Sequence, residues 1–353
     1  VGSGQPRIDF LGNTQGALKL EPQRTNLLPY SELMSLTAYP SSYNITSVQN
    51  TNVSPDGNTN AVTLSLTDTG LAYGYVDKLL TSQSAGTYTL SVFAKASTTN
   101  YAFLEIYVNG DATPSRNAYF NISNGSVESS SDCTASVEDY SSGWYRCIIT
   151  TTISSTSNLD LIFQPSNASS RNPTGNAIFY GAQLESGSYA TSYIKSEGSA
   201  VTRLADICSQ TVPDGVIGQT EGVLFMDVNL FARENFSFFS ISPNLASLSN
   251  FIGIGIAESF FAFEVVISGT AVVAYNFQNS STGNFKIAFA YKQNDFVAYV
   301  NGVQVMTDTS GGVISCSQIA LNNSNQNQPF LYKQVKLYNT RLSNSELAAL
   351  TQV

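Results

Sequence analysis

Hydrophobic and polar residues alternate along most of the chain with a period of two. In "TNAVTLSLTDT", Val62, Leu64 and Leu66 alternate with threonine and serine, and the same alternation returns in "GTYTLSVFAKAS" and "YAFLEIYVNG". Successive side chains of a strand point to opposite faces of a sheet, so this pattern predicts strands with one buried face. Residues typical of turns separate the runs at intervals of roughly 8–15 residues. The pattern therefore favours antiparallel sandwiches or jelly rolls.

The strand pattern falls into two sets, which we assign to residues 31–200 and 201–353. Before them, residues 1–30 hold turn residues around the short apolar piece Leu18–Leu20, and we expect an extended lead that packs on the first domain. A chain of 353 residues is long for one hydrophobic core and suits two domains. We therefore predict an all-β protein with two antiparallel β-sandwich (jelly-roll) domains in series.

The junction between the two sets is the stretch "GAQLESGSYATSYIKSEGSAVTRLAD", from Gly181 to Asp206. Its tyrosines Tyr189 and Tyr193, together with Ile194, are too apolar for a free linker. We expect them to be buried against one domain and to hold the two domains at a fixed angle. The alternative is that they only cap an exposed sheet edge.

One helix is predicted, in "LSNSELAALT" near the C-terminus. Ser343 is placed to cap it, and Glu346 three residues later completes a capping box ahead of Leu347 and Leu350. The helix is short, and we expect it to dock on the second domain.

Composition narrows the classes of function. Charged residues make up 12% of the chain and hydrophobic residues 42%, whereas a disordered chain or a helical bundle would carry more charge. The net charge is −9 and no basic run occurs, which argues against nucleic acid as a partner. No window approaches 18 apolar residues, so no membrane insertion is predicted. "VGSGQPRIDF" lacks the pattern of a signal peptide, which a mature chain would have lost.

Four cysteines and no histidine argue against a zinc site of the usual Cys/His type. Cys133 and Cys147 flank "TASVEDYSSGWYR", which has the pattern of strand, turn and strand. If this hairpin centres on Tyr140, the two cysteines fall opposite each other, and a cross-strand disulfide could form in an oxidising compartment. The alternative is a pair of small apolar thiols, and the sequence leaves both open.

Three separate motifs occur along the chain in this order: "PRIDFLGNTQGALKLEPQRTNLLPYSE", "SSGWYRCIITTTIS" and the junction stretch. Together they resemble a module common in bacteriophage tail fibres and other virion surface proteins. In that module a Pro-Arg start leads to a strand like "LEPQRTNLL", and a Trp-Tyr-Arg strand precedes the closing segment. The resemblance covers about Pro6 to Asp206 and implies a jelly roll similar to carbohydrate-binding modules.

The second half resembles the concanavalin-A-like, laminin-G-like lectin sandwich. The resemblance lies in "KIAFAYKQNDFVAYVNGVQV", a hairpin with a Tyr-Val-Asn-Gly turn, and in "YKQVKLYNTRLSNSELAALT", a last strand followed by the terminal helix. It implies the fold of residues 201–353 and says little about a ligand, because one fold hosts many functions.

The chain is predicted not to be an enzyme. Glycosidases need two carboxylates that flank the sugar bond. No strand here carries acidic residues at alternating positions: Glu258 and Glu264 are six residues apart, and Glu105 and Asp227 each stand alone within a strand. Without histidine the Ser-His-Asp route is also absent. Chemistry of the polysaccharide-lyase kind, which uses tyrosine and arginine, stays open.

Both of these folds often carry calcium, which requires several oxygen ligands. Glu32 and Glu185, near the two chain ends of the first domain, are the candidate ligands, although neither lies in a recognisable acidic loop. Asp56 in "SPDGN" and Asp111 in "NGDAT" are interpreted as turn residues. The alternative to a calcium site is a set of solvated turn carboxylates.

Carbohydrate sites combine aromatic rings with hydrogen-bonding side chains. Tyr73 and Tyr75 in "GLAYGYVDK" share a face and are the first candidates for contact with a sugar. Trp144 lies in an alternating strand and is interpreted as a core residue. A polar loop, "NNSNQNQP", either offers amides to a ligand or is a plain solvated turn; its candidate residues are Asn322, Asn323 and Asn325.

These observations predict a non-catalytic virion surface protein of a phage, a tail fibre or other receptor-binding protein that adsorbs to a bacterial surface glycan or another receptor. The expected partners are that receptor and other virion proteins, and the expected location is the virion or, alternatively, the extracellular space. Fibres are usually trimers, so a homotrimer is expected, although no coiled-coil heptads occur. Two alternatives remain: a structural decoration protein of the capsid or tail, and a secreted bacterial carbohydrate-binding protein.

Overall fold

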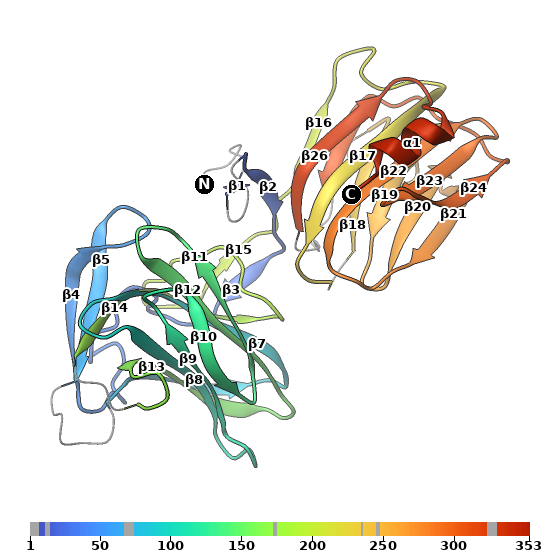
Figure 1. Cartoon of the computed structure of the whole chain (residues 1–353). Helices are drawn as coiled ribbons and strands as arrows, with labels where there is room; N and C mark the ends of the chain where they lie inside the picture. Colours follow the sequence, from blue (N-terminus) through green and yellow to red (C-terminus); the bar gives the residue numbers. More distant parts are fainter. Residues whose placement is uncertain are drawn as a thin grey trace. The chain divides into compact units, whose positions relative to one another are not determined.

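The structure is a computed structural model that describes residues 7–10, 15–66, 74–171, 175–233, 236–244, 248–322 and 330–353. Within these residues the protein is all-β, with antiparallel sheets and a single short helix at the C-terminal end, which confirms the predicted fold class (Figure 1). The chain divides into two compact units. The first module is Arg24–Arg203, and the second module is Val1–Gln23 together with Leu204–Val353.

Two antiparallel sheets form the body of the first module among its described residues. Sheet I has the strand order β10-β9-β8-β13-β6, with bounds β6 (Val76–Gln83), β8 (Tyr101–Val108), β9 (Ser115–Asn121), β10 (Ser126–Ser131) and β13 (Ser157–Ser166). Sheet II has the order β11-β12-β7-β14-β5-β4, with bounds β4 (Ile45–Val53), β5 (Thr59–Leu66), β7 (Gly86–Ala96), β11 (Thr134–Asp139), β12 (Trp144–Ile153) and β14 (Asn176–Ser186). Two further short strands, β3 (Arg24–Asn26) and β15 (Val201–Arg203), pair with each other.

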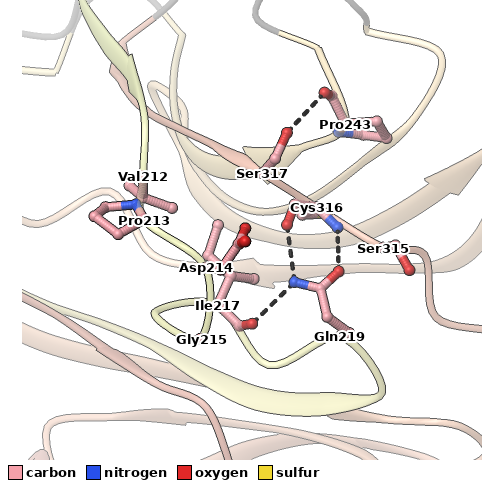
Figure 2. A pocket seen from close by; sticks show the side chains of 10 residues that line it. All are labelled: Val212, Pro213, Asp214, Gly215, Ile217, Gln219, Pro243, Ser315, Cys316 and Ser317. Carbon is pink, nitrogen blue, oxygen red and sulfur yellow. Dashed lines mark hydrogen bonds between the residues drawn. The ribbon is translucent and has the colours of Figure 1, made fainter.

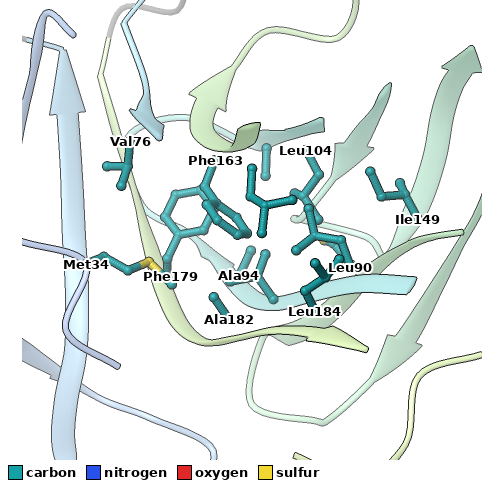
Figure 3. Packing of buried hydrophobic residues seen from close by; sticks show 14 of the residues in the cluster. Met34, Val76, Leu90, Ala94, Leu104, Ile149, Phe163, Phe179, Ala182 and Leu184 are labelled. Atoms are coloured by element: carbon teal, nitrogen blue, oxygen red, sulfur yellow. The ribbon is translucent and has the colours of Figure 1, made fainter. Parts of the chain in front are cut away.

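The two sheets of the first module share an apolar core, part of which Figure 3 shows. Sheet I contributes alternate residues such as Val76, Leu104 and Phe163, and sheet II contributes residues such as Leu90 and Phe179, all with no exposed surface. Each such side chain contributes about 1.5–3 kcal/mol when it leaves water. Because side chains alternate along a strand, this packing also decides which residues of sheet I point to its opposite face.

The second module is a second pair of antiparallel sheets among the described residues. Sheet III has the order β1-β2-β26-β17-β22-β23-β24, with bounds β1 (Ile8–Asp9), β2 (Ala17–Leu20), β17 (Glu221–Leu230), β22 (Gly283–Lys292), β23 (Phe296–Val300), β24 (Val303–Asp308) and β26 (Phe330–Tyr338). Sheet IV has the order β16-β25-β18-β19-β20-β21, with bounds β16 (Cys208–Thr211), β18 (Ser237–Ser242), β19 (Phe251–Ile256), β20 (Phe260–Ile267), β21 (Thr270–Gln278) and β25 (Gln318–Asn322). Their shared core includes Met226, Ile252, Phe263 and Phe289.

The Tyr-Val-Asn-Gly turn joins β23 to β24 as a tight hairpin in which Val300 pairs with Val303. Asn301 and Gly302 have φ angles of 48° and 80°, the left-handed conformation that a two-residue hairpin turn requires and that asparagine and glycine tolerate best. The Asn301 side chain also accepts a hydrogen bond from the Lys286 backbone N–H at 2.9 Å. The turn therefore sets the register of this edge of sheet III.

The predicted C-terminal helix is confirmed as α1 (Asn344–Leu350). Ser343 caps it, and its side chain and that of Glu346 form the capping box read from the sequence. Leu347 is buried in a small cluster with Val223 and Phe225 on sheet III, so the helix docks on the second module as expected.

The N-terminal segment corrects one prediction. We expected residues 1–30 to form a lead on the first domain, but this segment divides after Gln23. Strand β2 pairs with β26 of the second module, Leu18 lying opposite Tyr332, and Leu20 joins that module's core. Leu28, by contrast, belongs to the core of the first module. The sequence shows only a short apolar piece at Leu18–Leu20, because pairing with a segment so distant in sequence is decided by the folded chain.

The junction stretch packs on the first module, as predicted, through Tyr189, Tyr193 and Ile194. Ile194 is buried, and its backbone carbonyl accepts a hydrogen bond from the Asn26 side chain at 2.9 Å. The Tyr193 hydroxyl lies 2.6 Å from the Ser31 hydroxyl, and the Arg24 guanidinium lies 5.1 Å from the Tyr189 ring centre. That this stretch also fixes the angle between the modules stays a prediction.

The two cysteines of the predicted hairpin are not bridged. In the ladder of β11 with β12, Cys147 lies opposite Val137, so Cys133 is displaced from it by four positions. The turn contains Ser141, Ser142 and Gly143, all with positive φ, and is therefore centred beyond Tyr140. Cys147 is buried in the core, and the Cys133 thiol donates to the Asn117 carbonyl at 3.3 Å.

Trp144 is buried, as predicted, but not between the two sheets. It belongs to a smaller cluster with Phe93 and Tyr180 on the opposite face of sheet II. Its indole N–H donates to the Val53 carbonyl at 3.2 Å, which ties β12 to the edge strand β4. Trp144 is therefore a framework residue of the first module.

The division of the N-terminal segment gives a matched test with two leucines eight positions apart. Leu20→Ala should destabilise the second module by about 2–5 kcal/mol, and Leu28→Ala should destabilise the first by a similar amount, because each empties a site in a different core. Hydrogen exchange measured by mass spectrometry on peptides from β17 and β7 reports the two modules separately. Loss of protection in β7 for Leu20→Ala would contradict the assignment of β2 to the second module.

Candidate binding face

The face of sheet I that points away from the core brings together aromatic and polar side chains from neighbouring strands. Paired residues form three rows across the strands β9, β8, β13 and β6, and the first row has no member from β6. In that strand order, the first row is Tyr119, Phe103 and Gln164. The second row is Asn117, Glu105, Ile162 and Asp77, and the third row is Ser115, Tyr107, Asp160 and Leu79. We call this surface, with Tyr43, Tyr75 and Arg171 beside it, the outer face. The residues of each row are not adjacent in the sequence, and the register of the strand pairs brings them together.

Aromatic rings follow one edge of the outer face. Tyr75, a residue singled out in the sequence, forms a backbone bridge with Tyr43, and the two ring centres lie 6.1 Å apart. The Arg171 guanidinium lies 5.6 Å from the centre of the Tyr75 ring and 4.6 Å from that of Phe103, within the range of cation–π contact. Phe103 in turn contacts Tyr119, with ring centres 4.8 Å apart. Tyr73 lies outside the described residues.

Arg171 connects this aromatic edge to the polar rows. Its guanidinium is 3.2 Å from a carboxylate oxygen of Glu105, and its Nε donates to Gln164 at 3.0 Å. Glu105 also accepts a hydrogen bond from the Ser115 hydroxyl. Glu105 is nearly fully buried, so this charge is compensated in place rather than by water.

Asp77 is the polar residue of the outer face with the least compensation. Its side chain is buried, and its Oδ1 has no hydrogen-bond partner among the described residues. Burial, followed by the charges of Asp160 and Glu105, raises the pKa of Asp77 to about 7, and Lys78 opposes this only in part. Asp160 is half-buried and accepts from the Asn109 amide at 2.8 Å.

Sequence reasoning missed these acids because each one stands alone in its own strand. The sequence pattern presents Glu105 as an isolated acid of its strand and predicts no role for Asp77 or Asp160. The signal lies in the register: Ile162 of β13 lies opposite both Glu105 and Asp77, so all three side chains share a face. Without the strand order, that alignment is invisible.

Glu32 belongs to a different network in the first module. One of its oxygens accepts from the hydroxyls of Tyr180 and Tyr193, at 3.0 and 3.1 Å, and the other accepts from Asn60 and faces the Lys195 ammonium at 3.1 Å. A pocket of about 350 Å³ adjoins it, lined by Tyr30, Glu32, Leu33, Gln49, Asn50, Asn60, Ser196 and Glu197.

The carboxylate oxygens of both calcium candidates are engaged by protein groups. Calcium takes six to eight oxygen ligands, whereas the oxygens of Glu32 face three donors and an ammonium group. Glu185 is fully buried, and both of its oxygens accept from the backbone N–H and hydroxyl of Thr191. Among the described residues there is no group of three or more acidic, cysteine or histidine side chains placed to hold a metal ion.

The other predicted contact residues lie mostly beyond the described part of the chain. Asn322 ends strand β25, where its backbone pairs with Cys208, whereas Asn323 and Asn325 are outside the described residues. Asp56 and Asp111 are turn residues as interpreted: each accepts a backbone hydrogen bond from the residue two positions later, at 2.8 and 3.1 Å.

A pocket in the second module, of about 360 Å³, is shown in Figure 2. Gln219 spans its floor: its amide donates to the carbonyls of Ile217 and Cys316, and its carbonyl accepts from the Cys316 N–H, at 2.9–3.1 Å. Ser317 donates to the Pro243 carbonyl at 3.1 Å. These polar groups hold loops together, so we place the candidate site on the outer face instead.

Comparisons with known proteins were made for sequence and for structure. No protein-family model matches the chain, and no curated protein matches it in sequence. Partial structural likenesses occur to a Ruminococcus gnavus sialidase CBM40 bound to α2,3-sialyllactose (13% identity, 38% of this chain, 84% of that chain, TM-score 0.33). A second likeness is to a leech intramolecular trans-sialidase (16% identity, 41% of this chain, 26% of that chain, TM-score 0.35). A third is to a botulinum neurotoxin type C structure whose subject is ganglioside-dependent cell entry (12% identity, 44% of this chain, 40% of that chain, TM-score 0.34).

The chain spans less than half the length of the last two of these structures. At such identities and TM-scores, we take neither a family nor a function from them. No helix in the described part of the chain is both long and apolar enough to cross a membrane.

Asp77 predicts a pH dependence of stability. Its pKa is about 7 in the folded chain and near 4 when unfolded, so between these pH values the folded state binds more protons. Stability of the first module should therefore fall as pH rises from 4 to 7, by up to about 4 kcal/mol from this group. Urea unfolding across this range, compared between wild type and Asp77→Asn, measures it. An equal slope in both proteins would contradict the role of Asp77.

Calcium should have little effect on the first module. Because the oxygens of Glu32 and Glu185 are already engaged by protein donors, we expect EDTA or millimolar calcium to shift the melting temperature by less than about 1 °C. Differential scanning fluorimetry measures the shift, with magnesium as the ionic-strength control. A rise with calcium alone that is lost in Glu32→Gln would contradict this expectation.

Proposed function

We propose that this chain is a non-catalytic receptor-binding protein of a bacteriophage virion, which adsorbs to a bacterial surface glycan through the outer face of sheet I. The observation that carries the proposal is the alignment of tyrosines with carboxylate and amide side chains on one face of a rigid sheet. Tyr43 and Tyr107 are 47% and 36% exposed, so aromatic surface is available to stack on sugar rings. The phage and virion assignment is supported by the resemblance in sequence alone.

The polar groups of the outer face suit sugar hydroxyls. Asp160 accepts and Asn117 both donates and accepts, and both side chains are half-buried, which strengthens their hydrogen bonds. The surrounding strands hold them in fixed positions, so little conformational entropy is lost when a ligand binds. Sites of this kind bind weakly one at a time, and several copies on one particle supply avidity. A homotrimer in contact with other virion proteins would provide those copies.

The arrangement of the acids supports binding rather than hydrolysis. A glycosidase needs an open gap between its two carboxyl groups that admits the scissile bond. Glu105 and Asp77 flank Ile162 in the ladder, and all three side chains are less than 10% exposed. The isoleucine therefore fills the space that a sugar bond would need.

The proposal is tested by binding to a glycan array and to whole bacterial cells. Tyr107→Ala and Tyr75→Ala should each weaken binding about tenfold, the effect of losing one stacking contact. Tyr275→Ala, which removes a tyrosine that is 42% exposed in the second module, is the matched control and should bind as wild type does.

Each of three outcomes would contradict a different part of the proposal. Binding to cells no better than that of an unrelated sandwich protein would favour a decoration protein. Full binding by both tyrosine variants would remove the outer face as the site. Release of new reducing ends, or a fall in the viscosity of a polysaccharide, would show an enzyme.

A further inference from the structure

The ionisable groups of the outer face are mostly acidic. Asp77, Glu105 and Asp160 lie on adjacent strands of sheet I, and among the described residues Arg171 is the cation that contacts this group. Arg171 compensates Glu105, to which it is paired at 3.2 Å. Among the described residues, neither Asp77 nor Asp160 forms an ion pair, although the Lys78 ammonium acts on Asp77 from a greater distance.

The other cations near this surface are engaged elsewhere. The Lys78 ammonium, on β6, donates to the Ala38 carbonyl at 3.0 Å. The Arg116 guanidinium, on β9, is paired with Asp111 at 3.0 Å. Asp111 neutralises Arg116, whereas Lys78 keeps its charge and lowers the pKa of Asp77 only in part, so the neighbouring acids still dominate the potential at Asp77.

The state of Asp77 reflects this negative potential. It is 5% exposed, its Oδ1 lacks a hydrogen-bond partner among the described residues, and the neighbouring acids add to burial in raising its pKa. The same field that opposes a charge on Asp77 would oppose a carboxylate, sulfate or phosphate on a ligand. It would attract an ammonium group.

We propose that the outer face selects its glycan by charge, favouring sugars with a free, protonated amino group and rejecting acidic sugars. This inference rests on the proposed function, because it concerns the ligand of the same site. Asp160 is half-buried and pairs directly with the ligand ammonium, while the buried Asp77 contributes by releasing its proton when the ammonium binds. Tyr107, directly opposite Asp160, provides the adjacent ring for the sugar.

The test uses the full chain and three oligosaccharides that differ in charge: a glucosamine oligomer, its N-acetylated form and a galacturonic acid oligomer. At pH 6 and low salt, calorimetry should show the amino oligomer binding at least tenfold tighter than the N-acetylated one, and no binding of the acidic one. Salt at about 0.5 M should remove most of this preference, because it screens charges at the surface.

Variants assign the preference to named acids. Asp160→Asn should reduce the preference for the amino oligomer, measured as the ratio of the two affinities, to about threefold or less. Glu128→Gln removes one negative charge from an exposed position on β10 of the same sheet, and should keep the full preference.

The number of protons released when the ligand binds provides a second measurement. An ammonium bound near Asp77 lowers its pKa, so the wild type should release more protons per ligand bound than Asp77→Asn does. Calorimetry in two buffers of different ionisation enthalpy measures that release. Asp77→Asn replaces a carboxyl group that is already largely neutral at pH 6 with a neutral group of the same shape, so the variant should fold.

The outcomes separate the two proposals. Binding of the acidic oligomer as tightly as the amino oligomer, or an unchanged preference in Asp160→Asn, overturns charge selection and leaves glycan binding standing. Binding of none of the oligomers, nor of any glycan on the array, overturns the proposed function and this inference with it.

Discussion

The packing of sheet I against sheet II is the constraint on which the candidate site depends. Side chains alternate along a strand, so once Leu104 and Phe163 are buried between the sheets, Glu105 and Gln164 have to face the other way. A slip of one residue in β6, β8 or β13 would turn Asp77, Glu105 or Asp160 toward the core, and the cost of burying a charge there keeps the register in place. The core of Figure 3 therefore positions residues that it does not contain.

The same core packing also explains how the first module tolerates a buried carboxyl group with a raised pKa. Asp77 is buried, and one of its oxygens has no hydrogen-bond partner within the described part of the chain, an arrangement that costs stability above its pKa. A large apolar core in the same module offsets that cost, since several phenylalanines and leucines in it have no exposed surface. Buried carboxyl groups with a shifted pKa are often found where a protein binds a ligand, and Asp77 shares its face of sheet I with the aligned tyrosines.

The same reasoning accounts for the way the chain is divided between modules. Strand β2 completes one edge region of sheet III beside β26, although the two strands are separated by the entire first module in sequence. The first module is thus an insertion between β2 and the rest of the second module. Both ends of the inserted segment, β3 and β15, pair with each other, which closes the first module where the chain enters and leaves it.

The sequence by itself determined the local structure. Alternation predicted the strands, the residues of the Tyr-Val-Asn-Gly turn predicted a hairpin, and Ser343 with Glu346 predicted the capped helix, because each depends on neighbours in the chain. Only the tertiary structure decided the rest. The partner of β2, the offset of Cys133 from Cys147 and the meeting of Asp77, Glu105 and Asp160 all depend on register between strands. Register is settled by packing over the whole core, which no local pattern contains.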